Sequence, residues 1–559
     1  MTLFDNIKQL HQSELYGELK QLATIALTLC DNNTEAELLS PSQRYQVLVF
    51  LADSLCYLTE FKKSECIYRK ALLFKKAINK VAKGKCGNVT DITTDVEVKY
   101  RLYNCLTKME QDKEALNVLE SINTKQRNSK VNLALAKLYL KDGRDRSAIT
   151  CYKEVVREHP MALEAINGLL SLGMKSADVE ALVMNSLPHG SNYDWLTVWI
   201  KGHSYLASKE YNYAVSTFKL MESKLNLRDS VPILSAIAES KFYDGNYQQA
   251  MLVFQRIRSL DPYYMKNMDL YAYILVRERS SKELQSLAHD LIAISEQAPE
   301  PWIALGYMTL ICSNKTREKL SRALYFGVKA YTFKPKLVEA LLLKGSTLVE
   351  LKKTQDAIVH YQEVVRLAPH RFEAYQGLIN CYLISWRMKD AISWCGRAMR
   401  TLGNSARTLT LSASVLAKDP STISKAKQYL EKAMRFDPTY VEAVYITAEI
   451  LMQEKAYQQG IEILKKQLSV QTKTSARLHQ LLGDFLAQIG LYADALSQYS
   501  TALGIDPNYS RAKKGIERVE KQNVDLETDT EAEDMRASDN DIEFEGSDLD
   551  STWSEAEFN

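Results

Sequence analysis

The sequence has little of the two residues that most often interrupt regular secondary structure. Its 559 residues include only 12 Pro and 21 Gly, below the usual proportions of about 5% Pro and about 7% Gly. Few turns therefore break the chain, which favours a mostly helical protein. With 46% apolar and 25% charged residues, the composition is that of a globular protein long enough to bury a large apolar core.

Cysteine patterns of the usual kinds are also missing. The nine cysteines are odd in number and include no CxxC pair, which argues against a disulfide framework and indicates a reducing compartment. Residues 1–30 carry charges within their apolar periodicity, so they predict neither a signal peptide nor a membrane span. We therefore expect a protein of the nucleus and cytoplasm that does not bind membranes.

Motifs of the common catalytic and cofactor sites are absent as well. The eight histidines show no HExxH or comparable metal spacing, and GxGxxG, GxxxxGK[ST], GxSxG and HRD do not occur. Cys56 and Cys66 lie on expected helices, where a buried packing role is favoured over that of a nucleophile. We expect no catalytic residue, no cofactor and no metal, so the sequence does not predict an enzyme.

What is present includes a strong asymmetry of charge. The last segment, Asp525 to Asn559, holds 14 Asp or Glu and one basic residue, Arg536, which leaves 70 Lys and Arg against 55 Asp and Glu in the rest of the chain. No compact basic run interleaved with aromatic residues occurs, so nucleic-acid binding is not expected. High charge and few apolar residues predict a disordered tail, with solubility and regulation by phosphorylation both open as its role.

The strongest signal is an internal repeat. Gly483 is followed at +12 by Ala495, at +16 by Tyr499, at +19 by Ala502 and at +24 by Pro507. The same ladder of small, aromatic or large, small and proline residues recurs along the chain at intervals of 34 or 35 residues. A period of 34 is that of the tetratricopeptide repeat, a pair of antiparallel helices. The sequence therefore predicts an all-α superhelix (α-solenoid) of stacked hairpins.

Each type of residue in the ladder has a packing reason. Small side chains let two helices approach closely, the aromatic side chain fills the space between them, and proline ends the second helix. The small residues that we expect to be buried at helix contacts are Ala52, Ala136, Ala148, Gly202, Ala214, Ala238, Ala250, Gly345, Ala357, Ala391, Ser414, Ala426, Gly483, Ala495 and Ala502.

The clarity of the ladder divides the chain into four expected parts. Residues 1–170 form an N-terminal arm, 171–300 are degenerate central hairpins, 301–521 are a C-terminal superhelix, and 522–559 are the acidic tail. A polar stretch over residues 80–95 reads as a surface loop between helices.

Several strings that are not part of the ladder carry a family resemblance. They are SPSQRYQVLVFLADSL at 40–55, DWLTVWIKG at 194–202, LDPYYMKNMDLYAYILVRE at 260–278, EPW at 300–302, SRALYFGVKA at 321–330, LLLKG at 341–345 and LGDFLA at 482–487. With these strings and the acidic tail, the chain resembles the subunit-seven family of the anaphase-promoting complex, the cell-cycle ubiquitin ligase. The resemblance implies a non-catalytic scaffold subunit that pairs with itself through its N-terminal repeats and stacks on the other tetratricopeptide subunits of the complex.

The same resemblance implies a use for the inner surface of the superhelix. Related subunits hold isoleucine-arginine tails of coactivators, or small helical subunits, in this groove. Counting from the small residue of each first helix, we expect the groove to be lined by Leu411, Val415, Tyr445, Glu449, Met452, Gln480, Asp484 and Gln488. Glu449 and Asp484 would suit a ligand that ends in Arg. An alternative function is a co-chaperone or transport adaptor, but the cluster of Lys, Arg and Asn that a carboxylate clamp needs is not evident.

Overall fold

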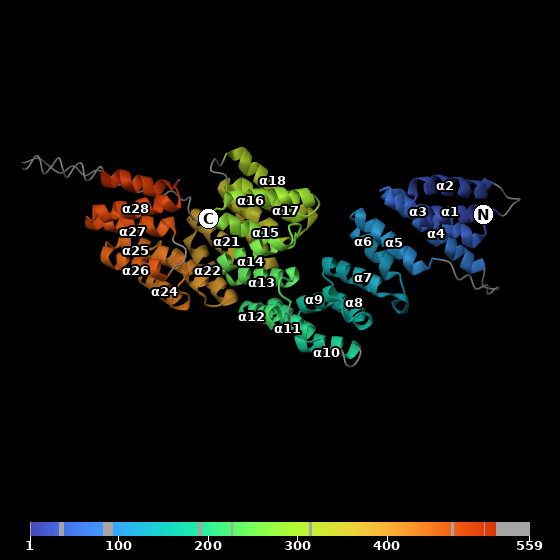
Figure 1. Cartoon of the computed structure of the whole chain (residues 1–559), viewed down its shortest axis with the longest axis horizontal. Coiled ribbons are helices and arrows are strands. Elements are labelled where there is room, and N and C mark those ends of the chain that lie inside the picture. The colour runs from blue at the N-terminus through green and yellow to red at the C-terminus, as the bar shows by residue number, and fades with distance from the viewer. Residues whose placement is uncertain are drawn as a thin grey trace, which may run out of the picture. The chain divides into compact units, whose positions relative to one another are not determined.

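A computed structural model describes residues 2–32, 38–81, 93–187, 193–224, 227–311, 316–470, 475–507 and 509–520. Every regular element in these ranges is helical, which confirms the all-α prediction (Figure 1). Most of the polar stretch at 80–95 and the whole acidic tail lie outside the described residues. No described helix is long and apolar enough to cross a membrane.

The chain divides into two units, Met1–Asp244 and Gly245–Asn559. The helices of the first unit are α1 (Leu3–Gln12), α2 (Tyr16–Asn32), α3 (Pro41–Tyr57), α4 (Phe61–Val81), α5 (Asp95–Lys108), α6 (Asp112–Glu120), the 3-10 turn η1 (Thr124–Gln126), α7 (Ser129–Asp142), α8 (Asp145–Glu158), α9 (Leu163–Ser171), α10 (Ser176–Ser186), α11 (Asp194–Ser208), α12 (Tyr211–Lys224) and α13 (Val231–Asp244).

The second unit continues the same pattern of short connections between antiparallel helices. Its elements are α14 (Tyr247–Leu260), α15 (Met268–Arg277), α16 (Ser281–Ile294), α17 (Pro299–Ile311), α18 (Arg317–Phe333), α19 (Val338–Glu350), α20 (Thr354–Leu367), α21 (Phe372–Ile384), α22 (Met388–Leu402), α23 (Ala406–Leu416), the 3-10 turn η2 (Pro420–Thr422), α24 (Ile423–Phe436), α25 (Val441–Gln453), α26 (Tyr457–Val470), α27 (Ala476–Ile489), α28 (Tyr492–Ile505) and a last helix over 510–520.

The prolines of the ladder lie where the second helix of a hairpin ends. Helix α20 ends two residues before Pro369, and α28 ends two residues before Pro507. In each case the residue that precedes proline leaves the helical region, with φ −137° and ψ 77° at Ala368 and φ −133° and ψ 99° at Asp506. Steric contact with the proline ring disfavours helical geometry at this position, so the sequence itself sets where the next hairpin begins.

The small residues of the ladder lie at the helix contacts. All of the residues named above for this role are buried, and most have no exposed surface. Gly345 of α19 shows why: a Cβ atom there would lie 2.7 Å from the ring of Tyr361 in α20. The same ring faces Gly377 of α21, where a Cβ atom would lie 2.4 Å away. The aromatic side chain thus fills a slot between two glycine-bearing first helices.

Candidate protein-binding surface

The first helices of the hairpins form the inner side of the second unit. Successive first helices contact one another, in the order α15, α17, α19, α21, α23, α25 and α27, and the described second helices of that unit have no comparable contacts with one another. A stack whose first helices are closer together than its second helices curves with the first helices inside. The inner surface is therefore the side on which a partner segment would be enclosed.

Side chains of the chain itself cross part of this inner side. The Tyr247 hydroxyl, at the start of α14, donates a hydrogen bond of 2.9 Å to Glu373 Oε1 in α21. Arg407 of α23 donates to the same hydroxyl and lies 3.6 Å from Glu373. Arg371 completes the cluster, with its Nε 3.1 Å from Glu373 Oε2 and its Nη1 2.6 Å from Glu339 Oε1. We call these five residues the inner polar cluster.

A second contact also joins the beginning of this unit to its later repeats. Arg277, at the end of α15, pairs with Glu442 in α25. Its guanidinium group also lies 4.6 Å from the centre of the Tyr247 ring, in the position of a cation–π contact. Helices α14 and α15 are therefore held against α21, α23 and α25, and this part of the inner side is filled by the chain's own side chains.

The electrostatics of the cluster fit a fixed structural role. Burial alone would raise the pKa of Glu373, but the charges of Arg371 and Arg407 and the hydrogen bond from Tyr247 lower it to about 2. Glu373 is thus ionised over the whole physiological range. The opposite holds for Asp269 in α15, because burial and the nearby Glu339 and Glu300 raise its pKa to about 8.

The groove residues expected from the sequence lie further along the unit, on α23, α25 and α27. Val415 is buried in the apolar core and Gln480 is 4% exposed, so neither presents much surface to a partner. Leu411 and Met452 are half-buried and pack against the core, while Gln488 is exposed. The expected residues therefore divide between the core and the accessible inner surface.

Four members of this set already have polar partners within the chain: Tyr445, Glu449, Gln480 and Asp484. Arg477 donates to Glu449 at 3.0 Å and stacks 4.3 Å from the ring centre of Tyr445. Asp484 accepts a 2.6 Å hydrogen bond from Tyr499, and burial raises its pKa despite that bond. A small pocket of about 40 Å³ lies beside Glu449, between α23 and α25.

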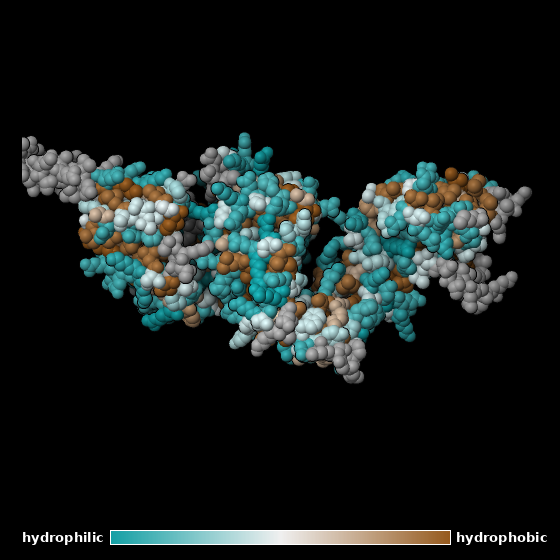
Figure 2. Space-filling model, in the orientation of Figure 1, coloured by the Kyte–Doolittle hydropathy of each residue, from teal (hydrophilic) through white to brown (hydrophobic). Residues whose placement is uncertain are grey.

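The first unit has a different kind of candidate surface, at its N-terminal end. Helix α2 buries Leu19, Ala23 and Ala26 against α1 and α3, yet it also exposes apolar side chains beside this buried face. Ile25 is 56% exposed and Leu29 one turn later is 47% exposed. Leu15 and Leu38, on either side of the helix, are exposed too. Figure 2 shows hydrophobic residues gathered over α2; we call Leu15, Ile25, Leu29 and Leu38 the N-terminal apolar face.

Sequence reasoning did not identify the inner polar cluster. Its members Tyr247, Glu373 and Arg407 belong to no motif, and they are separated by up to 160 residues in the chain. A weak signal existed, since Arg371 and Glu373 introduce charge at the start of a helix that is otherwise strongly apolar. Among the described residues, no group of His, Cys, Asp and Glu is arranged to hold a metal ion.

This architecture of stacked helical hairpins with an aromatic residue between small ones defines a tetratricopeptide-repeat protein. Models of the tetratricopeptide repeat match residues 131–160 and 338–371. The chain is 39% identical to human anaphase-promoting complex subunit 7 over 100% of its own length and 99% of that protein. The corresponding subunit of Arabidopsis thaliana is 27% identical over 94% of this chain and 95% of its own. The chain therefore belongs to the anaphase-promoting complex subunit 7 family.

A solved structure has the same fold at lower sequence similarity. A chain in the crystal structure of the anaphase-promoting complex hetero-tetramer Cut9–Hcn1 matches with a TM-score of 0.56 at 17% identity, over 92% of this chain and 95% of that one. At this level of identity the match supports the helical-repeat fold of the chain.

Proposed function

We propose that the chain is a non-catalytic scaffold subunit of an anaphase-promoting complex, found in the nucleus and cytoplasm, which joins other tetratricopeptide-repeat subunits and pairs with itself. The observation that carries the assembly role is full-length membership of the subunit 7 family, combined with a fold built of stacked helical hairpins. Stacked hairpins offer extended surfaces for protein partners.

Assembly is tested by purifying a tagged full-length chain from dividing cells of its own source and measuring the co-purifying proteins by quantitative mass spectrometry. The proposal expects subunits of the ubiquitin ligase in constant proportion to the chain. Enrichment of a chaperone or a transport receptor in their place would favour the adaptor function and contradict the scaffold.

Self-pairing is assigned to the N-terminal apolar face. Exposed leucine and isoleucine side chains that gather on one helix mark protein interaction sites in soluble proteins. A twofold pair would bring the same face of two chains together, so each side chain would be buried by a copy of its own surface. Ile25 and Leu29 lie one turn apart on α2 and would be at its centre.

The experiment uses a double variant that carries both Ile25→Glu and Leu29→Glu. Its matched control is Leu252→Glu, because Leu252 on α14 is also exposed, at 62%. Light scattering should give a dimer for the wild type and the control, and a monomer for the double variant with an unchanged circular dichroism spectrum. A monomeric wild type would contradict self-pairing. A double variant that stays dimeric would place the pairing on another surface.

The accessible inner surface of α25 and α27 is the part that we propose for an extended segment ending in arginine. Glu449 supplies a carboxylate there, and its present partner Arg477 shows that a guanidinium group fits beside it at 3.0 Å. Charge reversal at Glu449 and Asp484 together should release such a partner, whereas Glu462→Lys on the exposed side of α26 should not. Retention of every partner by the double variant would refute this site.

A further inference from the structure

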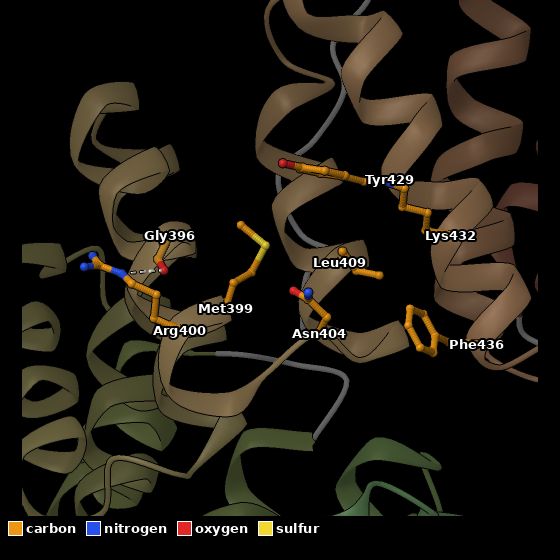
Figure 3. Close-up of a pocket in the computed structure, with 8 residues that line it drawn as sticks. All are labelled: Gly396, Met399, Arg400, Asn404, Leu409, Tyr429, Lys432 and Phe436. Carbon is orange, nitrogen blue, oxygen red and sulfur yellow. Dashed lines mark hydrogen bonds between the residues drawn. The ribbon is translucent and has the colours of Figure 1, made fainter.

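A cleft of about 490 Å³ lies on the outer side of the second unit, between the second helices α22 and α24. Its volume is within the range of about 300–1,000 Å³ that is typical of ligand pockets. Figure 3 shows Met399 of α22 and Tyr429 of α24 projecting towards each other across it, with Leu409 of α23 between them. Phe436, on the α24 side, is 64% exposed.

The lining combines these apolar groups with positive charge and contains no carboxylate. Arg400 lies on the α22 side, where its Nε donates to the Gly396 carbonyl at 3.2 Å, and Lys432 lies on the α24 side. Helices α22 and α24 together carry seven Lys or Arg and two Asp or Glu. A cleft with aromatic and aliphatic groups at its centre and cations at its edge fits an aromatic side chain that is flanked by acids.

The space exists in part because position 396 has no side chain. A Cβ atom at Gly396 would meet no heavy atom within 4 Å, although glycine is disfavoured inside a helix by about 0.5–1 kcal/mol relative to alanine. A larger residue at this position could therefore extend into the cleft without forcing its walls apart.

The end of the same chain has the complementary chemistry. Residues 541–558, DIEFEGSDLDSTWSEAEF, carry seven Asp or Glu, no basic residue, and the aromatic residues Phe544, Trp553 and Phe558. We propose that this segment docks on its own chain, with Trp553 in the cleft between α22 and α24 and its acidic neighbours beside Arg400 and Lys432.

The segment can reach the cleft. Helices α24 to α28 contact one another in order, and Gly515 of the last described helix lies against Tyr499 of α28. Five steps between adjacent helix axes of about 8–10 Å each place the cleft within about 50 Å of the last helix. About 33 residues separate Glu520 from Trp553, and a chain of that length spans up to about 110 Å when extended. The linker also keeps the local concentration of the segment high.

The test is fluorine NMR on the full chain with its six tryptophans replaced by 5-fluorotryptophan, using Trp553→Phe to assign the Trp553 line. If Trp553 is docked, its line should have the width of the folded body and a shift away from that of a free peptide of residues 541–558. Gly396→Phe, which fills the cleft, should convert it to a sharp line at the free-peptide position. Arg400→Glu together with Lys432→Glu should sharpen it in the same way.

The control is Gly504→Phe in α28, since a Cβ atom at Gly504 also meets nothing within 4 Å. This variant should leave the Trp553 line broad, and circular dichroism should show that all variants are folded. A sharp Trp553 line in the wild type would overturn the proposal and leave the cleft to an acidic aromatic segment of another protein. A line that stays broad in Gly396→Phe, or sharpens equally in Gly504→Phe, would overturn it too.

Docking between two copies is distinguished by mixing. The fluorinated Gly396→Phe chain has a free segment but a filled cleft. The unfluorinated Trp553→Ala chain has an open cleft but lacks the tryptophan that would occupy it. If the proposal is correct, the Trp553 line stays sharp when the two are mixed at equal concentration. Broadening of that line would show that the segment binds a second copy and would overturn docking within one chain.

Discussion

Replacing Gly377 with alanine should destabilise the second unit even though alanine is the better helix former. A Cβ atom at position 377 would lie 2.4 Å from the Tyr361 ring, whose other face is closed by Gly345, and the ring is 5% exposed. Overpacking of this kind costs about 1–3 kcal/mol, against a gain of about 0.5–1 kcal/mol from helix propensity. At the middle of these two ranges the net loss is about 1 kcal/mol.

The matched control for this change is Gly396→Ala, where the new methyl group meets nothing within 4 Å. This variant should be more stable by about 0.5–1 kcal/mol, so the two substitutions should have opposite signs. Hydrogen exchange of the α19–α21 amides measures the local effect, because about 1.4 kcal/mol corresponds to a tenfold change in an opening equilibrium. Unchanged or slower exchange in Gly377→Ala would refute the packing of Tyr361 between two glycines.

Three further changes test other parts of the account. Ala495→Leu should lower the thermal midpoint through a loss of about 1–3 kcal/mol, since Ala495 has no exposed surface; an unchanged midpoint would mean that the register is wrong. Because the folded-state pKa of Asp269 is raised to about 8, the folded state holds a proton that the unfolded state has lost, so stability should fall as pH rises from about 4 to about 8. Asp269→Asn should remove this fall, and parallel pH profiles for variant and wild type would contradict it. Glu373→Gln leaves Arg407 buried beside a neutral group and should cost about 3–5 kcal/mol in urea unfolding. The lowered pKa of Glu373 also means that its ionised carboxylate stabilises the folded state above about pH 4.3, and that this stabilisation is lost as pH falls towards about 2. A wild-type urea midpoint in Glu373→Gln would show that the inner polar cluster does not hold the repeats together.

The hairpins could be predicted from the sequence because their determinants are local. Gly483, Tyr499 and Pro507 lie within 25 residues of one another. One repeat therefore contains the small residue at its helix contact, the aromatic residue that packs between its helices and the proline that ends its second helix. Part of the ladder was still missed. Gly377 and Gly515 follow the aromatic residues Tyr361 and Tyr499 by 16 positions and face their rings, but each belongs to the next hairpin, so its role depends on the stacking.

The inner polar cluster could not be predicted because no local pattern specifies it. Tyr247 meets Glu373 and Arg407 only after the hairpins have curved through several repeats, and small changes in the angle between hairpins accumulate over that distance. The same accumulation decides which residues on α23, α25 and α27 are accessible. Val415 and Gln480 have the register expected of groove residues and are nevertheless buried.

Sedimentation of a dividing-cell extract through a glycerol gradient tests the central claim most directly. If the chain is a scaffold subunit of an anaphase-promoting complex, it should sediment with the ubiquitin-ligase activity, in a particle much larger than two copies of a 63.6 kDa chain, and removing it by its tag should remove that activity from the same fractions. Sedimentation of the whole pool of the chain as a monomer or dimer, apart from the ligase activity, would contradict the account.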